Sequence, residues 1–155
     1  MKFKIIADDY YKIFINEILI KNIDFKKERD LENFLKGIIL NIKNRYNIIL
    51  KGLYDVSISI NESIGALIEL EKIETFFSKN KDVDLRIKVI FECDFYFKTK
   101  DYYVLKDYSD IYYYNNSYYI DALELNDFIK YIEFGDIIEK RLYDVEEIGI
   151  KIGKN

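Results

Sequence analysis

Apolar and polar residues alternate along much of this chain, which is the pattern of strands that bury one face. Residues 3–7 and 11–15 alternate around a polar tip and predict an N-terminal hairpin. Residues 54–60 and 64–70 alternate in the same way and predict two antiparallel strands with one wet face. The longest alternation runs through residues 85–97 and predicts one long strand, bent near its middle.

Residues 30–46 have helical spacing instead, because their apolar positions recur every three or four residues. Residues 125–132 predict a short helix that ends at Gly135, and residues 136–139 have the pattern of a capping box that begins another short helix. Isoleucines at alternate positions in residues 148–152 predict a closing strand.

These elements together predict an α+β fold. We expect a mostly antiparallel sheet of five to seven strands, with one long helix at about residues 30–46 and short C-terminal helices packed on it. With 155 residues and no linker or repeat, we expect residues 1–155 to form a single α+β domain.

One stretch, "DIYYYNNSYYI" from Asp110 to Ile120, places five tyrosines around two asparagines. Asparagine tolerates a positive φ, so Asn115-Asn116 predicts a two-residue type I′ turn that pairs Tyr113 with Tyr118 and Tyr112 with Tyr119. This register divides the hairpin into two faces. The face expected in the core holds Ile111, Tyr113, Tyr118 and Ile120, and the face expected in solvent holds Asp110, Tyr112, Tyr114, Tyr119 and Asp121.

The net charge of −4 is unevenly spread along the chain. Residues 101–148 contain 12 acidic and 4 basic side chains, whereas residues 1–100 have a slight basic excess. An acidic half repels phosphate backbones, so we expect a basic protein surface as its partner rather than nucleic acid.

Residue types that are missing exclude several classes of chemistry. The chain has no His and a single Cys, which removes Ser-His-Asp and Cys-His catalysis and the common zinc ligand sets. Neither standard glycine-rich nucleotide loop occurs. Cys93 has the apolar parity of its strand and is expected to be buried, and neighbouring carboxylates such as Asp144, Glu146 and Glu147 are expected to be solvated. We therefore expect no catalytic residues, metal site or cofactor.

Composition also bears on origin and location. Lys, Asn, Ile, Tyr and Phe dominate while Pro, Trp and His are absent, which indicates an AT-rich genome. The first residues are too polar for a signal-peptide core, and no apolar run approaches the roughly 18 residues that span a membrane. We expect a cytoplasmic bacterial or phage protein with no membrane contact.

The function favoured by these observations is non-enzymatic protein binding. Exposed tyrosines ringed by carboxylates suit an inhibitor, immunity protein or adaptor that engages a basic patch, and in one version the carboxylates mimic the phosphates of a nucleic acid. Tyrosine is also simply favoured in strands, so the cluster has a purely structural alternative. Two other functions stay open: an enzyme that uses carboxylates and Mg²⁺ on a nucleotide or sugar, and a structural subunit of an assembly.

Overall fold

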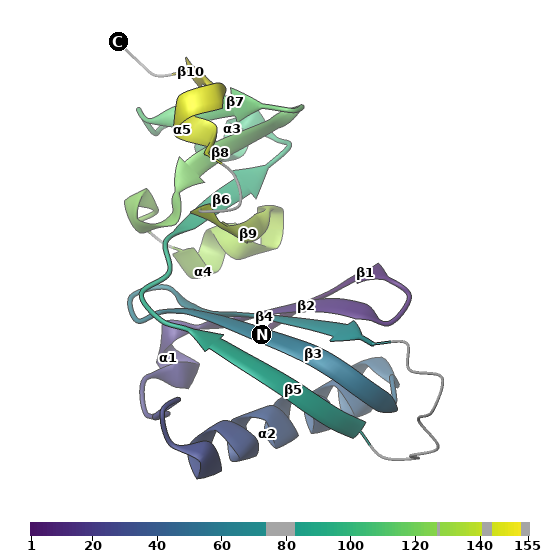
Figure 1. Ribbon diagram of the computed structural model, residues 1–155. Coiled ribbons are helices and arrows are strands. Elements are labelled where there is room, and N and C mark those ends of the chain that lie inside the picture. The colour runs from purple at the N-terminus through teal and green to yellow at the C-terminus, as the bar shows by residue number, and fades with distance from the viewer. Residues whose placement is uncertain (74–82, 127, 141–143, 153–155) are drawn as a thin grey trace.

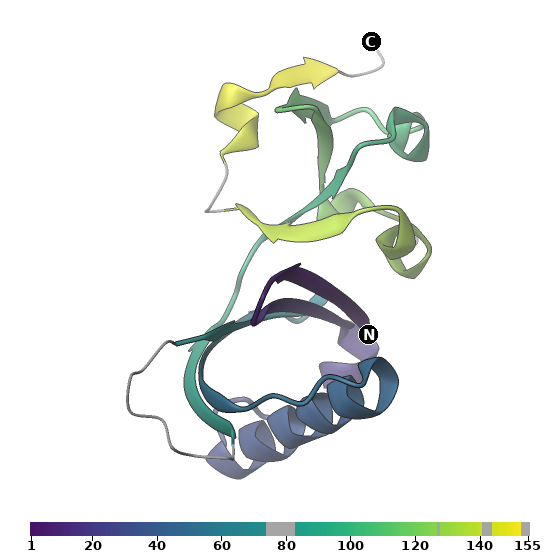
Figure 2. The ribbon, with the colours of Figure 1, turned by 90° about the vertical axis from the view of Figure 1, so that its right-hand side faces the viewer.

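The computed structural model describes residues 1–73, 83–126, 128–140 and 144–152, which form two five-stranded sheets. The second sheet stands over one face of the first, and the long helix α2 covers the opposite face (Figures 1 and 2). The expected α+β class is confirmed, but the single sheet of five to seven strands is wrong.

The first sheet has the strand order β1-β2-β4-β3-β5, and all of its pairs are antiparallel except the parallel pair β3–β5. Its strands are β1 (Lys2–Ala7), β2 (Tyr10–Asn16), β3 (Gly52–Asn61), β4 (Gly65–Lys72) and β5 (Val83–Ile90). The short helix α1 (Glu17–Ile20) and the long helix α2 (Glu28–Tyr46) follow β2. One stripe of α2 is buried through Leu35, Ile38 and Ile42, as its spacing predicts, and the helix ends at Asn47, whose φ is 56°.

The second sheet is antiparallel throughout, with the order β10-β7-β8-β6-β9. Its strands are β6 (Phe95–Thr99), β7 (Ile111–Tyr114), β8 (Ser117–Asp121), β9 (Asp136–Glu139) and β10 (Ile150–Ile152). Single helical turns connect them: α3 (Tyr102–Leu105), η1 (Ala122–Glu124), α4 (Phe128–Tyr131), η2 (Ile132–Phe134) and α5 (Val145–Ile148).

The long strand expected at residues 85–97 is divided between the two sheets. Alternation continues through β5 and β6, but the four residues between them leave the strand conformation. Glu92 has a φ of 55°, the Cys93 N–H donates to the Ile60 carbonyl at 2.9 Å, and the Asn61 amide donates to the Cys93 carbonyl at 2.8 Å. Because of these hydrogen bonds β5 ends beside the end of β3, and the chain then enters the second sheet as β6.

The helix expected to begin at residues 136–139 is also wrong, because this segment is strand β9. Its side chains alternate, with Ile137 and Glu139 buried, and it pairs along the edge of β6. The free edge of β6 offers this segment backbone hydrogen bonds and the burial of two side chains, which outweigh a local capping pattern. A helical turn does follow at α5, nine residues later than expected, after residues 141–143 that lie outside the described part of the chain.

Among the described residues there are two large apolar clusters and a small third one around Tyr96, and one of the large clusters belongs to both sheets. The first cluster lies between α2 and the inner face of the first sheet. The second contains the core of the second sheet together with four apolar residues of the first, which we call the seam: Phe14, Ile64, Leu67 and Ile90. Phe14 and Leu67 lie directly opposite each other on β2 and β4, and the Phe14 ring meets the edge of Phe128 at 5.3 Å between centroids.

Truncating the seam is expected to destabilise both sheets together. Leu67→Ala removes a side chain that is 4 % exposed, and we expect it to lower the free energy of unfolding by about 2–5 kcal/mol. In amide hydrogen exchange the slowest amides of β4 and of β8 are expected to accelerate by the same factor. Leu40→Ala, at a position on α2 that is 56 % exposed, is the control and changes exchange little. Acceleration confined to the first sheet would contradict a shared core.

Candidate functional site

The tyrosine hairpin has the turn and register that its sequence predicts. Asn115 and Asn116 both have positive φ, at 46° and 58°. Tyr112 pairs with Tyr119, and Tyr113 with Tyr118. The two faces therefore contain the residues expected of each.

One side of the hairpin is more buried than expected. Tyr119 is 2 % exposed, because Val145 of α5 and the ring of Tyr96 lie against it, with the two ring centroids 6.3 Å apart. The expected exposure of Tyr119 is wrong. Tyr112 is half-buried beside the same helix, and Tyr114 at the tip of β7 is 36 % exposed.

The two carboxylates of this face hold lysines. Lys151 on β10 lies 2.6 Å from Asp110, and its hydrogen bond lowers the pKa of that carboxyl below the usual range. Asp121 accepts from Lys140 at 2.5 Å and from the backbone N–H of Leu123 at the start of η1. Both carboxylates thus help to hold the second sheet together, and their role in binding a partner stays a prediction.

A larger acidic surface lies next to Asp121, where the connection between the sheets meets β9 and α5. We call it the acidic groove, a hollow of about 430 Å³. Its charged side chains are five carboxylates and one lysine: Glu92, Asp94, Glu139, Asp144, Glu146 and Lys140. Lys140 bridges Asp121 and Glu146 and lies 4.8 Å from the centre of the Tyr96 ring. This surface was not predicted, because its carboxylates come from segments about 50 residues apart that meet only through the pairing of β6 with β9.

The nucleophilic groups of the groove are held in their protonated forms. Burial and the adjacent Glu139 raise the pKa of the Cys93 thiol, whose side chain is 6 % exposed as its strand parity predicts. Burial and the carboxylate of Glu146 raise the pKa of Tyr96 far above its usual value. Neither group is an activated nucleophile.

A second hollow, of about 310 Å³, lies between the outer face of the first sheet and strands β6 and β9. We call it the inter-sheet cleft. It is lined by four lysines and three carboxylates: Lys2, Lys4, Lys12, Lys98, Glu69, Asp136 and Glu139. Phe14, Leu67 and Ile137 add apolar surface.

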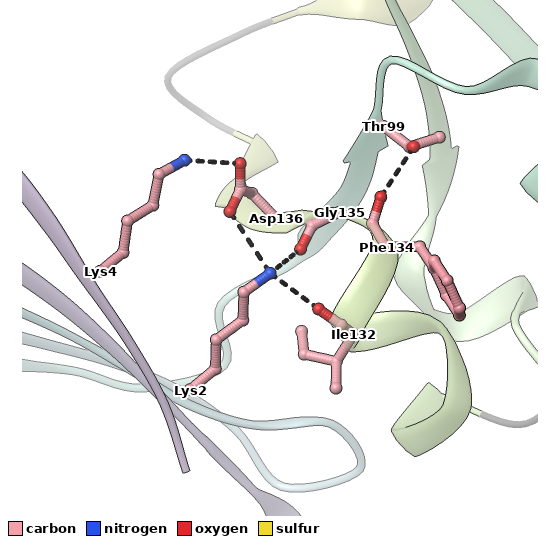
Figure 3. Close-up of polar contacts among 7 residues, drawn as sticks. All are labelled: Lys2, Lys4, Thr99, Ile132, Phe134, Gly135 and Asp136. Atoms are coloured by element: carbon pink, nitrogen blue, oxygen red, sulfur yellow. Dashed lines mark hydrogen bonds and ion pairs between the residues drawn. The ribbon is translucent and has the colours of Figure 1, made fainter. Parts of the chain in front are cut away.

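Two of these lysines tie the sheets together (Figure 3). The Lys2 ammonium donates to the carbonyls of Ile132 and Gly135 and lies 3.6 Å from Asp136, and Lys4 donates to Asp136 at 2.8 Å. We call these contacts the lysine clamp. Thr99 on β6 fixes the receiving segment, because its hydroxyl donates to the Phe134 carbonyl at 2.9 Å.

Among the described residues, no three His, Cys, Asp or Glu side chains are grouped so that they would hold a metal ion. No helix in that part of the chain is both long and apolar enough to cross a membrane. Comparisons with protein-family models, with curated proteins and with solved structures found no significant match to this chain. The function must therefore be argued from the surfaces themselves.

The lysine clamp is expected to weaken in acid. Burial alone raises the pKa of Asp136, but Lys4 and Lys2 outweigh it, so the pKa lies below its usual value. The stabilisation is therefore complete above the ordinary carboxyl pKa of about 3.9 and is lost as the pH falls through the lower folded-state value. Asp136→Asn should cost about 1 kcal/mol of unfolding free energy at pH 7 and almost nothing near pH 2, measured by urea denaturation.

The control for the clamp is Glu133→Gln. Glu133 is exposed on the adjacent turn η2 and forms no ion pair with a described residue, so its substitution should have little effect at either pH. If Asp136→Asn lowers the free energy of unfolding by the same amount at both pH values, the charge of Asp136 does not stabilise the fold.

Proposed function

We propose that this protein is a small non-enzymatic binding module, of the inhibitor, immunity or adaptor type, that engages a basic patch on a partner protein through the acidic groove. The observation that carries the proposal is the charge of that groove, where five carboxylates surround one lysine. Carboxylates gathered in a concave surface focus a negative potential, which steers a basic partner and orients it on arrival.

The rim of the groove combines charge with apolar area. Phe91 is 43 % exposed, and Glu92 and Asp94 on either side of Cys93 are exposed as well. Interfaces of this kind need a desolvated aromatic anchor in addition to charge. Phe91 supplies such an anchor, with Lys26 5.5 Å from the centre of its ring.

The backbone of this rim is held in place before any partner arrives. Cys93 is turned into the core and hydrogen-bonded at its N–H and its carbonyl to Ile60 and Asn61, so its two neighbours face outward. A surface that is already ordered loses less conformational entropy on binding. The connection between the sheets therefore suits a recognition surface.

The tyrosine hairpin contributes less than its sequence suggests. Tyr119 is covered, and Asp110 and Asp121 already hold lysines, so only Tyr114 and part of Tyr112 stay exposed on this face of the hairpin. In the inhibitor version of the proposal, the carboxylates of the groove take the place of phosphates in the basic groove of a nucleic-acid enzyme.

The test is a charge reversal at the rim. Affinity capture from a lysate of the cells that make the protein should recover a partner with a basic surface, in a complex that weakens steeply as salt rises. The double variant Glu92→Lys/Asp94→Lys should bind that partner at least about tenfold more weakly, because it sets like charges against each other.

The matched control reverses two exposed carboxylates elsewhere, Glu32 on α2 and Glu71 on β4. The variant Glu32→Lys/Glu71→Lys has the same net charge as the rim variant and should keep the affinity of the wild type. If both double variants lose affinity equally, the effect comes from net charge alone. If the rim variant binds the partner as tightly as the wild type does, the role of the groove is refuted.

A further inference from the structure

One lysine of the inter-sheet cleft differs from the other three in its partners. Lys2 and Lys4 share Asp136, and Lys12 lies 3.6 Å from Glu69. Lys98 has no carboxylate within ion-pair distance among the described residues, and its ammonium lies 5.8 Å from the centre of the Tyr119 ring.

Lys98 is partly withdrawn from solvent. It lies on β6, one strand in from the edge of the second sheet, between Tyr119 on β8 and Asp136 on β9, and its side chain is half-buried. Removing a lysine ammonium from water costs free energy, and a cation–π contact with an aromatic ring offsets only part of that cost. A negatively charged group of a ligand would offset more of this desolvation cost.

The rest of the cleft is suited to an apolar body. Its accessible apolar surface comes from Ile6 on β1, which is 40 % exposed, and from the half-buried Ile138 on β9. Phe14, Leu67 and Ile137 also line it but are only 4–6 % exposed. A hollow of about 310 Å³ at a junction between two packed units, in which apolar side chains lie beside charged groups, is typical of a small-molecule site.

From these observations we infer that the inter-sheet cleft binds a small organic anion, with its carboxylate or phosphate on the Lys98 ammonium and its apolar part against Ile6 and Ile138. A cation is disfavoured, since four lysines face three carboxylates in the cleft. This site is separate from the rim of the acidic groove, and such a ligand would touch both sheets at once.

Phenyl phosphate is the probe, because it joins a phosphate to an apolar ring of suitable size. In amide chemical-shift titrations it should give saturable shifts at cleft residues of β2, β4, β6 and β9. Inorganic phosphate, which lacks the ring, and benzyl alcohol, which lacks the charge, should each bind at least about tenfold more weakly. Inorganic phosphate that binds as tightly as phenyl phosphate would refute the apolar part of the site.

Lys98→Met should weaken phenyl phosphate binding at least about tenfold, the loss expected for one hydrogen bond to a charged group. Lys98→Arg keeps the charge and should restore most of the affinity. Lys100→Met, at an exposed lysine two residues further on, is the matched control and should bind as the wild type does.

A second substitution serves if Lys98→Met does not fold. Ile6 is 40 % exposed at the mouth of the cleft, so Ile6→Glu adds a negative charge there without opening the core, and it should also weaken binding. No saturable shifts at cleft residues of the wild type, or equal affinity in the wild type and Lys98→Met, would overturn the inference. The rim variant Glu92→Lys/Asp94→Lys should bind phenyl phosphate as the wild type does, which separates this test from that of the protein-binding proposal.

Discussion

The first sheet has apolar residues on both of its faces, and this constraint determines how the rest of the chain must pack. The face toward α2 is satisfied by the helix, whereas Phe14 and Leu67 on the other face need a second cover. The second sheet supplies it through the seam. Across the first sheet, the row that contains these two residues runs from Lys2 on β1 to Ile90 on β5, and the clamp begins at one end of it while the connection to β6 begins at the other.

The distribution of charged side chains follows from the same packing of the two sheets. The slightly basic first hundred residues and the acidic remainder meet at the lysine clamp, which neutralises Asp136, while Lys140 and Lys151 neutralise Asp121 and Asp110. The carboxylates that gather in excess are those around the connection between the sheets, and they form the acidic groove. Three of its five carboxylates come from the acidic remainder of the chain, and Glu92 and Asp94 come from the first hundred residues.

Local patterns predicted local structure well, and errors arose where distant segments meet. The turn at Asn115-Asn116, its register and helix α2 depend on nearby residues and were predicted. The division of residues 85–97 was missed because alternation continues across it, and the break is set by Asn61 and Ile60, which are some 30 residues away. The burial of Tyr119 and the acidic groove depend on α5 and on the pairing of β9, which no local pattern encodes.

The seam and the clamp together should make the two sheets one rigid unit. Residual dipolar couplings of backbone amides at neutral pH test it most directly, because they report the orientation of each sheet in a common frame. Couplings from β2–β4 and from β6–β8 should fit a single alignment tensor with the orientation described above. Two tensors of different magnitude would show that the sheets move independently, and would contradict the account.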